Sequence, residues 1–136
     1  MRKVKHYQKT YYTRKESERE IIKFRDREET YFYRVYFQNM GGKTIPELLS
    51  DLRKKGDFTS PYHLIVTRDG DVHSMRPLEA VAGYGLPYNE LGIHILVDAE
   101  DEKSMTRIQK LNLGDVVDSL TKEAYPGLER FVEEDD

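Results

Sequence analysis

Cysteine and tryptophan are both absent from this chain of 136 residues. Without cysteine, disulfide bonds and cysteine-ligated zinc sites are excluded. No apolar run reaches the ~20 residues that span a membrane, and no signal-peptide pattern opens the chain. Neither sign of charge predominates, because the formal net charge is only −3. The chain as a whole therefore has no electrostatic attraction to nucleic acid. We therefore expect a cytoplasmic protein with neither a membrane nor a nucleic-acid partner.

The charges that are present are distributed unevenly. Residues 1–30 contain ten Lys or Arg against six Asp or Glu, and residues 133–136 are all acidic. This pattern predicts three parts: a basic N-terminal segment over 1–29, a domain over 30–128 and an acidic tail over 129–136. The basic segment, which also carries several tyrosines, is either solvated surface or a contact for phosphate or an acidic partner.

Strand-like runs are the clearest structural signal in the chain. Four of them, rich in aromatic and β-branched residues, lie at 31–38, 62–67, 71–75 and 91–97. The turn Asp69-Gly70 separates the second run from the third and predicts that they form an antiparallel hairpin. A looser alternation at 3–12 is compatible with a further strand.

Two helices are expected between these strands and after them, over 44–55 and 104–123. Each begins with a capping-box pattern, Thr44 with Glu47 and Thr106 with Gln109. A short charged helix is also expected over 17–27. The order of strands and helices predicts the fold class α/β, a single-domain mixed β-sheet flanked by helices. One shared core is expected from these apolar residues: Leu48, Leu52, Ile65, Ile93 and Ile95.

The segment 60–97 resembles the zinc-dependent N-acetylmuramoyl-L-alanine amidases, a family that includes phage amidase-type lysozymes and peptidoglycan recognition proteins. The family pattern is Tyr-His followed by apolar residues, a basic-Asp-Gly turn, an Arg, a Gly-His loop, an Asn and an apolar-Gly-apolar strand. The matching residues here are Tyr62-His63-Leu64-Ile65, Arg68-Asp69-Gly70, Arg76, Gly83-Tyr84, Asn89 and Leu91-Gly92-Ile93. The resemblance implies an amidase-like domain over 30–128.

The zinc chemistry of that family needs two His and a third ligand, with water in the fourth position. Where the family has its first ligand, this chain has no His, and Tyr36 is the best match; after Tyr125 neither His nor Cys follows. The loop His is replaced by Tyr84. The resemblance therefore implies the fold without its zinc: no metal, no cofactor and no catalytic residue. A rebuilt metal site from His63, His73 or His94 with Asp98 is the alternative.

A ligand-binding groove is the feature that the resemblance implies is retained. We assign to it the tyrosines that map onto the family's active-site face, together with a cation and an amide. These residues are Tyr36, Tyr62, Arg76, Tyr84 and Asn89. Residue by residue, the alternatives are a core aromatic for Tyr62, a surface arginine for Arg76 and a loop-stabilising Asx turn for Asn89. The resemblance implies a structural hydrogen bond for His63, and His94, between two isoleucines, is expected to be buried and hydrogen-bonded.

Three functions remain open at this point. The first is a catalytically inactive, phage-related amidase-like protein that binds peptidoglycan fragments. The second is a phage counter-defence protein that sequesters a nucleotide-like signal in the same groove, because tyrosine rings stack on bases and Arg76 pairs with phosphate. The third is an active amidase. In each case the partner is a small polar or anionic ligand, and ten tyrosines also suit a homo-oligomer interface.

Overall fold

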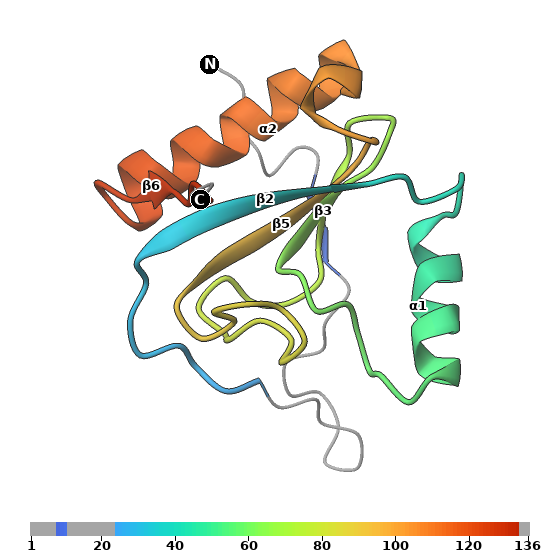
Figure 1. Ribbon diagram of the computed structural model, residues 1–136, viewed down its shortest axis with the longest axis horizontal. Helices are drawn as coiled ribbons and strands as arrows, with labels where there is room; N and C mark the ends of the chain where they lie inside the picture. Colours follow the sequence, from blue (N-terminus) through green and yellow to red (C-terminus); the bar gives the residue numbers. More distant parts are fainter. Residues whose placement is uncertain (1–7, 11–23, 134–136) are drawn as a thin grey trace.

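In the part of the chain that the structure describes, six strands form one sheet in the order β1-β4-β3-β5-β2-β6. The computed structural model describes residues 8–10 and 24–133 (Figure 1). The strands are β1 (Gln8–Thr10), β2 (Phe32–Gln38), β3 (Leu64–Val66), β4 (Val72–Ser74), β5 (Gly92–Asp98) and β6 (Glu129–Arg130). Only the pair β3 and β4 is antiparallel, and the other neighbours run parallel. The predicted mixed sheet, with its antiparallel hairpin, is confirmed.

The hairpin turn is held by local hydrogen bonds and by α2. Gly70 has a φ of +90°, a conformation that glycine adopts without strain. The Asp69 carboxylate accepts a hydrogen bond from the Asp71 backbone N–H at 3.1 Å. The Asn112 side chain, which is buried in α2, donates to the Gly70 carbonyl at 2.7 Å. The turn that the Asp-Gly pair predicts is therefore also a docking point for a helix.

Both long helices begin where their capping boxes predict. In α1 (Ile45–Lys54) Thr44 and Glu47 exchange side-chain and backbone hydrogen bonds, and in α2 (Arg107–Ser119) Thr106 and Gln109 do the same. These pairs satisfy backbone N–H groups that a first helical turn leaves without partners. A 3-10 turn, Glu102–Ser104, precedes α2, and a π-helical turn, Leu120–Ala124, follows it.

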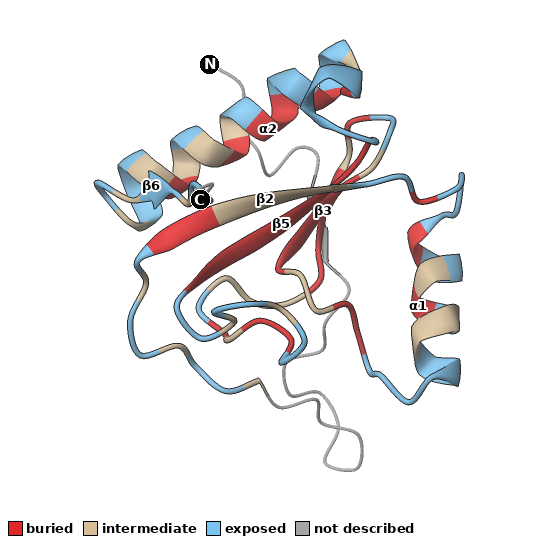
Figure 2. Cartoon of the chain, in the orientation of Figure 1, coloured by how far each residue is buried: buried red, intermediate tan, exposed pale blue. Residues whose placement is uncertain are grey.

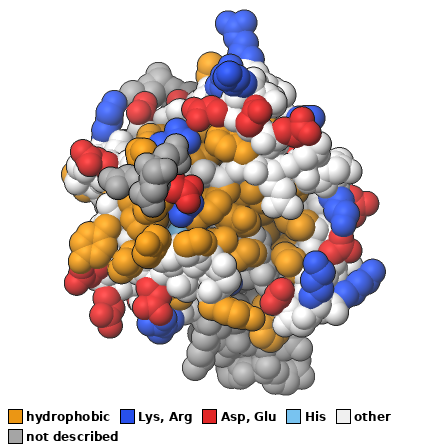
Figure 3. Space-filling view, in the orientation of Figure 1, with side chains coloured by type: hydrophobic (Ala, Val, Ile, Leu, Met, Phe, Trp, Pro, Cys, Tyr) orange, Lys and Arg blue, Asp and Glu red, His pale blue; other side chains and the backbone are white. Residues whose placement is uncertain are grey.

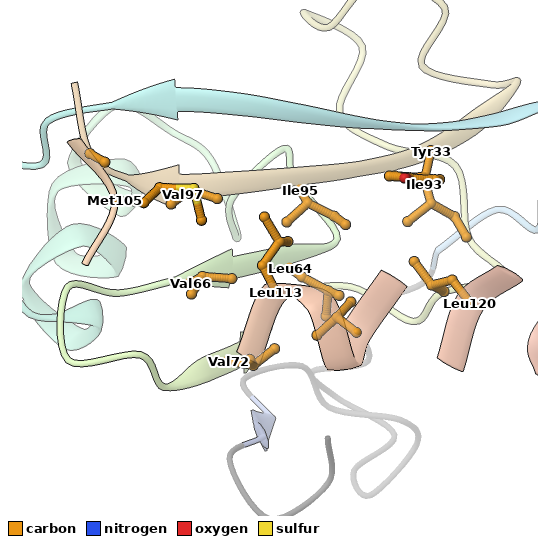
Figure 4. Packing of buried hydrophobic residues seen from close by; sticks show 12 residues of the cluster. Tyr33, Leu64, Val66, Val72, Ile93, Ile95, Val97, Met105, Leu113 and Leu120 are labelled. Carbon is orange, nitrogen blue, oxygen red and sulfur yellow. The ribbon is translucent and has the colours of Figure 1, made fainter. Parts of the chain in front are cut away.

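The sheet separates two hydrophobic clusters (Figure 2). On one face, Leu64, Ile93 and Ile95 pack with residues of α2 (Figure 4). On the other, Ile65 and Leu96 pack with Ile45 and Leu49 of α1. The prediction of one shared core is therefore wrong. Ile65 pairs in register with Leu96, and since neighbouring strand residues alternate between faces, Ile93 and Ile95 lie on the opposite side.

The N-terminal expectations fall partly outside the described residues. Within the predicted strand 3–12, Gln8–Thr10 form β1. Most of the predicted helix 17–27 lies outside the described residues, and its last four residues, 24–27, are not helical: Asp26 forms an isolated bridge with Ala80. The proposed division of the chain at 30 and 128 stays a prediction, although β1 and β6 join the same sheet. No helix within residues 24–133 is long and apolar enough to cross a membrane.

Candidate ligand-binding site

A cleft of about 390 Å³ lies between α1 and the carboxyl ends of β2 and β5. Tyr62 and Leu96 contribute to its wall, and Leu48 and Leu52 contribute from the helix. Its polar lining consists of Gln38, Asn39, Lys43, Asp51, Lys55 and Ser60. In the space-filling view, hydrophobic side chains gather over the region between β2 and α1, with charged side chains mostly around them (Figure 3). The cleft therefore offers an apolar wall with a polar rim.

Tyr36 and Tyr62 form an aromatic pair beside this cleft. Their ring centroids are 5.2 Å apart in an edge-on arrangement. Tyr36 also stacks on His94, with a centroid distance of 5.7 Å, and its hydroxyl donates to His94 Nδ1 at 2.8 Å. Burial raises the pKa of both tyrosines, so both hydroxyls are protonated at neutral pH. The sequence prediction that these two rings lie together is confirmed.

Two neutral histidines lie behind the tyrosine pair. The His94 Nε2–H donates to the Tyr88 carbonyl at 3.3 Å, which leaves Nδ1 to accept from Tyr36. The His63 Nε2–H donates to the Ala80 carbonyl at 2.7 Å, and His63 Nδ1 accepts the His94 backbone N–H at 3.0 Å. All four ring nitrogens are therefore engaged. The expected hydrogen bond of His63 and the expected burial and hydrogen bonding of His94 are confirmed, and His63 is buried as well.

Burial strongly lowers the pKa of both imidazoles. Burial, helped by the nearby Arg27 guanidinium and opposed by the hydrogen bond to the Ala80 carbonyl, brings the pKa of His63 to about 3. It brings the pKa of His94 to about 4, with Arg34 and Arg27 acting in the same direction. Both rings are therefore uncharged at neutral pH and serve as fixed hydrogen-bonding partners.

Arg76 and Asn89, which the sequence analysis assigned to ligand binding, form hydrogen bonds that hold the loop after β4 in place. Arg76 donates to the carbonyls of Ser60 (2.8 Å) and Val81 (3.2 Å). The Asn89 side chain donates to the Ala82 carbonyl at 3.1 Å. Both residues thus stabilise the loop, although the Asn89 contact reaches back to Ala82 and is not the Asx turn that the sequence left open as the alternative. Ligand binding by either residue stays a prediction.

Tyr84 lies apart from the tyrosine pair. Its side chain is 93% exposed, and it lines a second depression of about 220 Å³ together with Arg76, Asp57 and Pro61. Gly83 packs against Pro61 so closely that a Cβ would lie 2.4 Å from the proline side chain. The prediction that the three tyrosines lie in one groove is therefore wrong for Tyr84, which lines a neighbouring depression that shares Pro61 with the cleft.

The residues around the cleft do not fit a zinc ion. The end of β2 contributes the amides Gln38 and Asn39, and the strand after α2, which is β6, continues into Phe131. Among the described residues, no three His, Cys, Asp or Glu side chains converge as metal ligands do. The alternative metal site also lacks support, because His63 and His94 use every ring nitrogen in hydrogen bonds, while His73 and Asp98 line a different depression.

An arginine that sequence reasoning did not assign lies next to Tyr36. The Arg34 guanidinium carbon is 5.0 Å from the Tyr36 ring centroid and 4.4 Å from that of Phe131. Phe131 also packs against Phe32, at 5.0 Å between centroids. The alternation of β2 places residues 32, 34 and 36 on one face. This alternation could have indicated that Arg34 lies beside Tyr36. The contact of Arg34 with Phe131, in contrast, depends on where β6 joins the sheet.

Solved structures with the same fold are amidases and peptidoglycan recognition proteins. The endolysin amidase LysCS from Clostridium intestinale matches with a TM-score of 0.61 and 19% identity over 74% of this chain and 68% of that chain. Drosophila peptidoglycan recognition protein SD matches with a TM-score of 0.63 and 14% identity over 80% and 71%. The hydrolase AmiA from Staphylococcus aureus gives a TM-score of 0.64 and 12% identity over 90% and 63%.

The fold is therefore that of the amidases and peptidoglycan recognition proteins, as the sequence resemblance implied. No protein-family model matches the sequence, and no curated protein matches it.

Proposed function

We propose that this protein is an amidase-like ligand-binding protein that does not hydrolyse its ligand. The observation that carries the proposal is the cleft itself. It has an apolar wall that includes Tyr62, against which Tyr36 packs, while its polar lining contains amides and a lysine–aspartate pair rather than the His-rich ligand set of a zinc site. Such a surface suits the binding and orientation of a small polar molecule.

A peptidoglycan fragment is the ligand class that we favour. One structural neighbour is a complex of peptidoglycan recognition proteins LCa and LCx with tracheal cytotoxin, at 13% identity and a TM-score of 0.60. AmiA was likewise solved with its ligand. In this chain, sugar or peptide amide groups would meet Gln38 and Asn39, and the aliphatic parts would pack on Tyr62 and Leu96.

A nucleotide-like signal is the second candidate, as expected of a phage counter-defence protein. Tyrosine rings offer π faces for a base, and Lys55 on the rim of the cleft has no ion-pair partner among the described residues and suits a phosphate. Calorimetric titration with muramyl dipeptide in parallel with AMP distinguishes the two classes. Binding of AMP alone would favour the second candidate.

The Tyr62→Ala variant tests whether the cleft is the binding site. We expect its affinity for the bound probe to fall about tenfold, since a buried aromatic contact of this kind is worth one to a few kcal/mol. Tyr84→Ala is the matched control, because Tyr84 is exposed and lines another depression. Equal affinities for the two variants would place the binding site elsewhere on the protein.

A further inference from the structure

Arg34 is a cation that is largely withdrawn from water at the edge of the tyrosine pair. Its side chain is only 16% exposed. The rings of Tyr36 and Phe131 lie within 5.0 Å of its guanidinium carbon and orient it. A guanidinium with little hydration favours a well-placed anion, because an uncompensated buried charge is costly.

The carboxylate that now meets Arg34 is a poor partner. Arg34 Nη2 lies 3.4 Å from the Glu133 carboxylate, whose side chain is 76% exposed. A strong charge-assisted hydrogen bond is shorter than this, and exposed ion pairs contribute little. Phe131, two residues earlier, is anchored against Phe32 and Tyr88. Glu133 can therefore leave Arg34 while the aromatic anchor stays in place.

Other arginines near the site are committed elsewhere. Arg76 donates to two backbone carbonyls, and Arg27 donates to the Ala80 carbonyl, the Thr30 hydroxyl and the Tyr125 hydroxyl. Among the described residues, the Arg34 side chain hydrogen-bonds the Tyr36 side chain, and Glu133 is its ion-pair partner. Tyr36 contacts both Arg34 and Tyr62, so a ligand that reaches from the cleft across Tyr36 arrives at this guanidinium.

We propose that Arg34 recognises the anionic group of the ligand, a carboxylate or a phosphate, and that Glu133 occupies that group's place in the free protein. The inference rests on the proposed function, since the ligand must first lie on the tyrosine pair. Glu133 then competes with the ligand, and its departure exposes the Nη2–H of Arg34. The two residues of one ion pair should consequently have opposite effects on affinity.

The test compares Arg34→Gln and Glu133→Gln by calorimetric titration at low salt. The probes are muramyl dipeptide, the same compound with its carboxyl group amidated, AMP and adenosine. Arg34→Gln should weaken binding of the anionic probe about tenfold or more, as expected for a hydrogen bond to a charged group. Glu133→Gln should strengthen it about threefold, the typical worth of an exposed ion pair. The neutral probe of each pair should bind both variants and the parent equally.

Two controls separate this inference from effects on folding and from overall charge. Glu102→Gln removes the same charge from a comparable exposed pair, in which Glu102 lies 3.5 Å from Arg130, and should leave affinity unchanged. In the double variant Arg34→Gln/Glu133→Gln, the gain from Glu133→Gln should disappear, because the two residues act through one contact.

The outcomes also separate this inference from the proposed function. If the parent binds a probe but Arg34→Gln binds it equally well, or Glu133→Gln binds it no better, the role of Arg34 is overturned and the cleft function stands. If neither the parent nor Glu133→Gln binds any of the four probes, both are overturned. Comparing muramyl dipeptide with AMP shows whether the anionic group that Arg34 recognises is a carboxylate or a phosphate.

Discussion

Acidification should destabilise the fold through its two buried histidines. The pKa of His63 is about 3 and that of His94 about 4 in the folded protein, against an ordinary value of 6.5. The unfolded chain therefore binds up to two more protons than the folded protein between pH 6.5 and 4. Stability is at its full value above pH 6.5 and falls as the pH decreases through this window.

The magnitude follows from the number of protons. Two histidines that take up a proton only on unfolding give a slope of about 2.7 kcal/mol per pH unit near pH 5. Urea unfolding curves at closely spaced pH values from 7 to 4 measure this slope directly. The His94→Gln variant should lower the slope by about 1.4 kcal/mol per pH unit, because one titrating group is removed.

The comparison between parent and variant cancels the contribution of carboxylates that titrate in the same range. NMR of the histidine C2 protons over the same pH range measures the pKa of each histidine in the folded protein independently. A parent whose stability is flat between pH 6 and 4.5, or a His63 or His94 resonance that titrates near pH 6.5 in the folded protein, would refute the assignment of two neutral, fully hydrogen-bonded rings.

Two further predictions concern packing and the tyrosine–histidine contact. Gly92→Ala would place a Cβ 2.4 Å from the Phe32 ring and should lower the free energy of unfolding in urea by about 2 kcal/mol. Gly85→Ala, with no atom within 4 Å of its Cβ, should leave that free energy unchanged. Equal stabilities of the two variants would contradict the packing of β5 on β2. Tyr36→Phe leaves the buried His94 Nδ1 without its hydrogen-bond donor and should lower the free energy of unfolding by about 1–2 kcal/mol. Tyr84→Phe, at an exposed position, should change it by no more than about 0.5 kcal/mol. An unchanged stability of Tyr36→Phe would argue against the hydrogen bond to His94.

Local signals in the sequence determined the elements that depend on neighbouring residues. The capping boxes at Thr44 and Thr106 marked the helix starts, and Asp69-Gly70 marked the hairpin turn, because each of these features is satisfied within a few residues. The partition of the core was misjudged. Whether Ile65 and Ile93 lie on the same side of the sheet depends on strand register, and no local pattern encodes register between strands that are distant along the chain.

The candidate site was predictable only where a motif fixed the position. Tyr62 came from the Tyr-His motif, and Tyr36 came from its place on the strand before α1. Arg76 appeared available for a ligand, but it is used by the carbonyls of Ser60 and Val81, which only the folded loop brings near. Arg34 was missed because its partner Phe131 lies almost a hundred residues away and reaches it through the docking of β6.

The central claim is that the cleft binds its ligand without metal-dependent hydrolysis. The most direct test is calorimetric titration of muramyl dipeptide into the protein with and without a chelator, followed by chromatography of the recovered ligand. We expect the same affinity in both conditions and intact muramyl dipeptide after prolonged incubation with equimolar zinc. Release of the dipeptide from the sugar, or binding that the chelator abolishes, would contradict it.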